Sequence, residues 1–112
     1  MDIEVKSWLH DILNAISEIE SFLEDSTQSF IDYQNDLRTR RAVERNIEII
    51  GEALSRILKF QPAIAISNSR KIVDTRNRIA HGYDSVPDEV IRGIVTQHIP
   101  VLKAEILELL ED

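Results

Sequence analysis

The chain has 112 residues, no cysteine and a net charge of −7, which predicts one modest domain without a disulfide framework or a thiolate metal site. No apolar run approaches the roughly 18 residues of a membrane helix, and the acidic opening MDIEVKSWLH lacks the apolar core of a secretion signal. We therefore expect a single cytoplasmic domain that spans residues 1–112 and does not associate with a membrane.

Charge is unevenly distributed along the chain. Residues 1–35 carry one Lys against eight acids, and residues 84–112 carry two basic residues against seven acids. Residues 36–83 instead carry ten Lys or Arg against five acids. This basic middle permits phosphate binding at one face, while the acidic remainder limits indiscriminate binding. The simpler explanation is that these arginines are ordinary solvated helix residues. Charge alone does not decide between this explanation and phosphate binding.

The first predicted helix runs from about residue 2 to residue 25. Its apolar residues recur every three or four positions and form one stripe: Val5, Trp8, Leu9, Ile12, Ile16, Ile19 and Leu23. The stripe assigns Trp8 to the core. The following STQSFIDYQND is rich in small polar residues and predicts a connection with room for one short helical turn. Tyr33, in that connection, carries no signal.

The second predicted helix runs from about residue 36 to residue 60, and Pro62 ends it. Its buried stripe consists of Val43, Ile47, Ile50, Leu54 and Ile57. Its polar side gathers Arg38, Arg41, Arg45 and Glu52. Gly51 lies where a residue without a side chain would let another helix approach closely.

The third predicted helix begins near Asn68 or Ser69, either of which suits an N-cap, and ends near Gly82. It is shorter than the others and mostly polar, so core formation does not explain its composition.

The fourth predicted helix begins at SVPDE, where Ser85 caps and Pro87 suits the first turn. Pro100 predicts a kink in it. Its apolar face consists of Val90, Ile91, Ile94, Val95, Leu102, Ile106 and Leu109. Four amphipathic helices with short connections predict an all-α fold, an antiparallel four-helix bundle.

The stretch RNRIAHGY, residues 76–83, concentrates chemistry at the end of the third helix. Asn77 and His81 are one turn apart on one face and can share a hydrogen bond. Arg76 and His81 are about 140° apart around the helix, too far for one tight site within it. A second copy related by a two-fold axis would bring the arginine of one chain to the histidine of the other, so we expect a homodimer.

These residue types suit metal-free RNA cleavage. Histidine titrates near neutral pH and moves protons, and arginine grips phosphate with a planar fork. A two-metal nuclease would need clustered carboxylates, which Asp74 and Asp84 do not form, so no metal and no cofactor are expected. In the simpler explanation, Arg76 pairs with an acid and His81 is a satisfied interface residue. The residues alone leave both explanations open.

RNRIAHGY resembles the R-x-x-x-x-H-x-Y signature of the HepT-like toxins, a branch of the HEPN ribonucleases, and RRAVERNIEIIGEAL at residues 40–54 is similar to that family's second characteristic block. The resemblance implies a HEPN-like bundle and the toxin of a type II toxin–antitoxin system, a metal-independent endoribonuclease. Arg76 and His81 match the catalytic pair of that family. Asn77 occupies the polar position after the arginine, and we expect Asn77 and Arg78 to support phosphate binding.

The resemblance also gives Tyr83 a role. It matches the tyrosine that a MNT-type nucleotidyltransferase antitoxin modifies with AMP, which would add phosphodiester charge beside Arg76 and His81 and repel RNA phosphate. Packing at the helix end is the simpler role for a lone tyrosine. The chain departs from the family at Ser69, where many relatives carry a tryptophan seven residues before the arginine.

Two functions from different classes therefore compete. The first is a toxin ribonuclease with a composite site across a homodimer. The second is a non-catalytic HEPN module that binds a nucleotide or nucleic acid, or docks a nucleotidyltransferase. The intact motif favours the first, and the acidic net charge favours the second.

Overall fold

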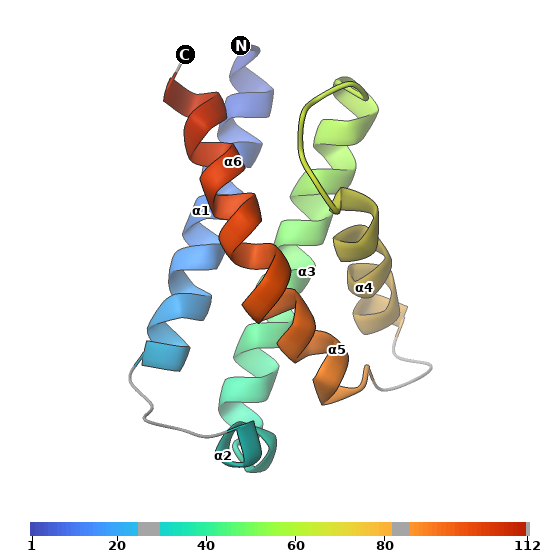
Figure 1. The fold of residues 1–112 in the computed structure, drawn as a ribbon. Helices are drawn as coiled ribbons and strands as arrows, with labels where there is room; N and C mark the ends of the chain where they lie inside the picture. The colour runs from blue at the N-terminus through green and yellow to red at the C-terminus, as the bar shows by residue number, and fades with distance from the viewer. Residues whose placement is uncertain (25–29, 82–85, 112) are drawn as a thin grey trace.

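The computed structural model describes residues 1–24, 30–81 and 86–111, and all regular secondary structure within them is helical (Figure 1). The all-α prediction is confirmed. In chain order the elements are α1 (Ile3–Glu24), α2 (Phe30–Asn35), α3 (Leu37–Phe60), α4 (Ser69–His81), α5 (Asp88–Gly93), the π-helix η1 (Ile94–His98) and α6 (Ile99–Glu111).

The long helices form the predicted antiparallel bundle. In Figure 1, α1 runs downward, α3 upward and α4 downward, and the continuous rod of α5, η1 and α6 returns upward. This rod places α6 beside α1, so both termini lie at the same end of the bundle. The short helix α2 lies at the opposite end and supplies the extra turn that the sequence predicted.

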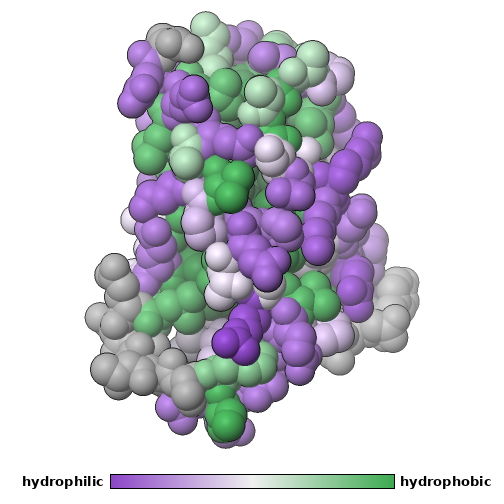
Figure 2. All heavy atoms as spheres, viewed as in Figure 1, coloured by the Kyte–Doolittle hydropathy of each residue, from purple (hydrophilic) through white to green (hydrophobic). Residues whose placement is uncertain are grey.

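The apolar stripes face a common core. The α3 stripe is buried as predicted, and so are most α1 stripe residues and the centre of the last rod. Fully buried side chains include Leu9, Ile12, Ile16, Ile19, Ile47, Ile50, Leu54, Ile57, Ile72, Ile91, Ile94 and Leu102. Burial stabilises the fold by about 1.5–3 kcal/mol for each such side chain. Outside the core, the face in Figure 2 mixes hydrophilic residues with small groups of hydrophobic ones.

Asp36 defines the start of α3. Its Oδ1 accepts a hydrogen bond from the Thr39 backbone N–H at 3.2 Å, and its Oδ2 accepts one from the Thr39 hydroxyl at 2.8 Å. A carboxylate at this position satisfies one of the unpaired N–H groups at the helix start and complements the helix dipole. The predicted boundary near residue 36 is therefore confirmed.

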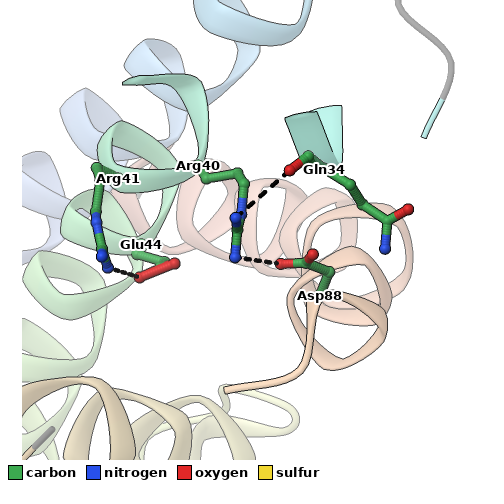
Figure 3. Close-up of polar contacts among 5 residues, drawn as sticks. All are labelled: Gln34, Arg40, Arg41, Glu44 and Asp88. Carbon is green, nitrogen blue, oxygen red and sulfur yellow. Dashed lines mark hydrogen bonds and ion pairs between the residues drawn. The ribbon is translucent and has the colours of Figure 1, made fainter. Parts of the chain in front are cut away.

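Arg40 ties three elements together at the α2 end of the bundle (Figure 3). Its Nη2 pairs with Asp88 in the first turn of α5 at 3.3 Å, and its Nη1 donates to the Gln34 carbonyl at 3.4 Å. Tyr33 is buried at this end of the bundle, and its burial, together with the carboxylates of Asp88 and Glu44, raises its pKa to about 12. Tyr33 is thus a buried, neutral part of the fold, which the sequence did not indicate.

Pro100 lies two residues after η1. Proline lacks an N–H and its ring clashes with the carbonyl four residues earlier in a regular helix. In η1 the hydrogen bonding is wider, and the Ile99 N–H donates to the Ile94 carbonyl. The sequence predicted a kink at Pro100, and the structure has a π-helical turn, η1, that ends two residues before it. Pro87 occupies the N-cap position of α5, whereas the predicted Ser85 cap lies outside the described residues.

Among the described residues, no helix is both long enough and apolar enough to cross a membrane.

Candidate active site around Arg76

Helix α4 lies close against α3 at Gly51, as the sequence predicted. A Cβ atom at Gly51 would overlap the Cβ of Arg76 and lie 2.8 Å from its Cγ and 3.4 Å from the Ile72 carbonyl oxygen. Because Gly51 has no side chain, the Arg76 side chain can pack directly against the α3 backbone at this point. Gly51 of α3 therefore positions the arginine of the motif.

Replacing Gly51 with alanine should destabilise the protein by about 1–3 kcal/mol, the usual cost of overpacking. The new methyl group would meet the start of the Arg76 side chain, which cannot move without moving α4. Gly93 is the matched control, because a Cβ there meets nothing within 4 Å and its backbone is helical. Gly93→Ala should stabilise the protein by about 0.5–1 kcal/mol. Urea unfolding of both variants measures the two effects, and equal values would contradict this account.

Arg76 is held by two oxygen acceptors. Its Nη2 lies 2.6 Å from Glu52 Oε2, and its Nη1 donates to Asn77 Oδ1 at 2.9 Å. The other oxygen of Glu52 accepts from Arg56 Nε at 3.3 Å. These charge-assisted bonds fix the plane of the Arg76 guanidinium. The simpler explanation considered for Arg76 is thus correct in one respect, because the arginine does pair with an acid.

The pairing does not bury the guanidinium completely. The Arg76 side chain is 30% exposed, and its Nε is buried without a hydrogen-bond partner in the described part of the chain. An arginine has five N–H donors, two of them on each terminal nitrogen. Glu52 contacts Nη2 and Asn77 contacts Nη1, one partner for each nitrogen. Donors therefore remain on both terminal nitrogens for a second oxyanion.

His81 is the last residue of α4 and is exposed. It is five positions after Arg76, which corresponds to about 7.5 Å along the helix axis and about 140° around it. Within one chain, Arg76 pairs with Glu52 and donates a hydrogen bond to Asn77, whereas His81 lies at the end of α4. Arg78 is exposed on α4. Tyr83, the predicted modification site, lies outside the described residues.

A groove of about 440 Å³ follows the seam between α1 and α3 and reaches Arg76. Ala15 and Ala53, both nearly buried, contribute small side chains between longer charged ones. The lining residues are Trp8, Asp11, Asn14, Ala15 and Glu18 of α1, Arg45, Asn46, Glu48, Ile49, Glu52, Ala53 and Arg56 of α3, and Arg76 of α4. We call this feature the α1–α3 groove.

The sequence indicated little of this groove. The sequence assigned Trp8 to the core, and it does pack against the core, but its side chain is only half-buried. Trp8 also lines the groove and contacts the Phe60 ring edge-on, with 6.1 Å between the ring centroids. The sequence shows only that polar residues recur at three- and four-residue spacing beside the apolar stripe on both α1 and α3, a pattern that any amphipathic surface helix has.

Residues 1–24, 30–81 and 86–111 contain no group of three or more His, Asp or Glu side chains placed to hold a metal ion.

Comparison with known proteins assigns the family. The family model described as HepT-like ribonuclease matches residues 12–109, which include the Gly51 contact, both blocks of the motif and His81. The chain belongs to the HepT-like ribonuclease family. The resemblance found from RNRIAHGY is therefore confirmed.

Individual relatives of this HepT-like chain agree with that assignment. A candidate RNase of Methanocaldococcus jannaschii is 29% identical over 97% of this chain and 89% of its own length. A candidate HepT ribonuclease of Thermococcus cleftensis is 34% identical over 93% of this chain and 94% of its own length. A second M. jannaschii protein, a gamma-glutamylcyclotransferase and candidate RNase, is 31% identical over 97% of this chain but only 49% of its own length. No solved structure matches the chain significantly.

Proposed function

We propose that this chain is the toxin of a type II toxin–antitoxin system and acts as a metal-independent endoribonuclease. The observation that carries the proposal is the placement of Arg76 on α4, where it is seated at Gly51 and held by Glu52 and Asn77. Family membership and relatives named as ribonucleases support RNA as the substrate.

In the proposed reaction, the ribose 2′-oxygen attacks the adjacent phosphorus while the bond from phosphorus to the 5′-oxygen breaks. His81 takes the proton from the 2′-hydroxyl or supplies one to the leaving oxygen. Arg76 holds the phosphate and stabilises the charge that develops on it. The products are a 2′,3′-cyclic phosphate and a 5′-hydroxyl.

The site is proposed to be shared between the two chains of a homodimer. Arg76 is turned toward α3 and the α1–α3 groove, whereas His81 lies at the exposed end of α4. One helix cannot direct both groups at the same phosphate, for the angular reason given above. A two-fold axis near α4 would place the Arg76 of one chain beside the His81 of its partner.

Cleavage should persist in excess EDTA and should leave 2′,3′-cyclic phosphate ends. The proposed chemistry uses only a histidine and an arginine, and neither group requires a metal ion. The measurement is cleavage of a labelled RNA with and without chelator, followed by analysis of the ends by mass spectrometry. Activity that disappears with EDTA and returns with magnesium would refute the mechanism.

A non-catalytic module is the second candidate. Glu52, 2.6 Å from Arg76, offsets the charge that RNA would meet, and the whole chain is acidic. Such a module would bind a nucleotide or nucleic acid, or dock a nucleotidyltransferase, without cleaving RNA.

Tyr83 is proposed as the control point, modified with AMP by a MNT-type nucleotidyltransferase antitoxin. Tyr83→Phe removes only the hydroxyl, so this variant should fold, cleave RNA and escape neutralisation by the antitoxin with ATP. Wild type should gain the mass of one or more AMP groups and lose activity. Mass spectrometry and cleavage assays of both proteins, run in parallel, make the comparison. Equal modification of both proteins would place the acceptor elsewhere, and an inactive but folded Tyr83→Phe would make the hydroxyl part of the catalytic set.

A further inference from the structure

We propose that the α1–α3 groove is the track along which single-stranded RNA reaches Arg76, with one nucleobase stacked on Trp8. The inference rests on the proposed ribonuclease function and assigns its substrate-binding surface. Apart from Arg76, the residues that it assigns to RNA binding lie on α1 and α3.

Three arginines follow the groove. Arg45 and Arg56 are eleven residues apart on α3, so they lie on nearly the same side of the helix and about 16 Å apart along it. Arg76 enters between them, at Gly51 and Glu52. All three line the same groove. Several consecutive nucleotides of a single strand span this length, so flanking phosphates can meet Arg45 and Arg56 while Arg76 holds a central one.

Trp8 lies at the Arg56 end of this line, because it contacts Phe60, one turn beyond Arg56 on α3. The two rings meet at 73°, so they do not cover each other by stacking. Trp8 is half-buried and lines the groove. Proteins that bind single strands combine a cationic groove with an aromatic ring on which a base stacks. The groove contains such a ring and three arginines, although its carboxylates outnumber the arginines by four to three.

Four carboxylates also line the groove, and they shape the expected binding. Glu52 already pairs with Arg76 and Arg56, so a phosphate must displace it or share the two guanidinium groups. Asp11, Glu18 and Glu48 repel phosphate but accept N–H groups of base edges. We therefore expect moderate affinity, a shallow dependence on salt and a preference for single strands, whose base edges are unpaired.

The chain provides its own probe, because Trp8 is its one tryptophan. The ligand for the test is a short 2′-O-methyl oligonucleotide, in which the attacking hydroxyl is blocked. The single strand should quench Trp8 fluorescence on binding, and a duplex of the same sequence should not. Binding without quenching would overturn the stacking on Trp8.

Variants distinguish binding in the α1–α3 groove from a general effect of positive charge on affinity. Measured by anisotropy of a labelled oligonucleotide, Trp8→Leu should weaken binding by about 5- to 150-fold, the range for loss of one stacked base. Trp8→Phe keeps an aromatic ring and should retain most of the wild-type affinity. Arg56→Gln should weaken binding. Lys103→Gln is the matched control, because it breaks the ion pair with Glu20 between α1 and α6, outside the groove. It should leave affinity unchanged, and circular dichroism checks that each variant folds.

Cleavage assays distinguish this inference from the proposed function. If wild type cleaves RNA but Trp8→Leu and Arg56→Gln bind the oligonucleotide normally, the track is wrong and the ribonuclease stands. If the oligonucleotide quenches Trp8 but wild type cleaves no RNA, the track stands and the chain is a binding module.

Discussion

Replacement of His81 with alanine should lower the rate of RNA cleavage by about 10²–10⁴-fold, the usual contribution of a general acid or base. His81 is exposed at the end of α4, so its removal creates no cavity and should leave the fold intact. RNA binding should be largely retained, because Arg76 and the α1–α3 groove are unchanged. Single-turnover cleavage, oligonucleotide affinity and thermal unfolding together test this expectation.

His10 offers the control. It is also exposed, lies on α1 and does not line the α1–α3 groove, so His10→Ala should cleave RNA at the wild-type rate. If His81→Ala also cleaves at that rate, His81 is not the general acid or base and the proposed mechanism is refuted. Absence of cleavage by the wild-type chain itself would instead favour the non-catalytic module.

Arg76→Lys should lower the cleavage rate by about 10²–10³-fold, comparable to the loss of one preorganised donor to a developing charge. Lysine keeps the positive charge and can still pair with Glu52, so the contact between α3 and α4 should survive. It has no planar fork, however, and cannot hold Glu52, Asn77 and a phosphate in one fixed plane. The measurement is single-turnover cleavage with unfolding monitored in parallel. Wild-type cleavage by Arg76→Lys would show that only the charge is needed.

Mixing the two inactive variants tests whether the site is shared. In a mixed dimer of Arg76→Lys and His81→Ala chains, one of the two composite sites would contain both wild-type residues. Activity should therefore return on mixing. If the chains exchange, as shown by differently tagged copies, and activity does not return, each site lies within one chain and the composite dimer is refuted.

The helices and much of the site chemistry follow from the sequence alone. The three-to-four-residue spacing of apolar side chains predicted α1, α3 and the final rod, and the α3 stripe of Val43, Ile47, Ile50, Leu54 and Ile57 is fully buried. Such patterns succeed because helix periodicity is a local property of the chain. The motif around Arg76 and His81 is equally local, since eight consecutive residues contain it, and the same residues indicated the family.

The tertiary structure alone decided what surrounds Arg76. Glu52 and Arg76 are distant in sequence, and only the approach of α4 at Gly51 brings their side chains together. Trp8 shares the spacing of core residues, yet it is only partly buried because it lies at the edge of its stripe, where α1 and α3 leave a groove. Tyr33 is buried because Arg40 and Asp88 draw α2, α3 and α5 together around it. Periodicity shows which side of a helix is apolar, but the neighbouring helix determines how much of that side is covered and which charges meet across the seam.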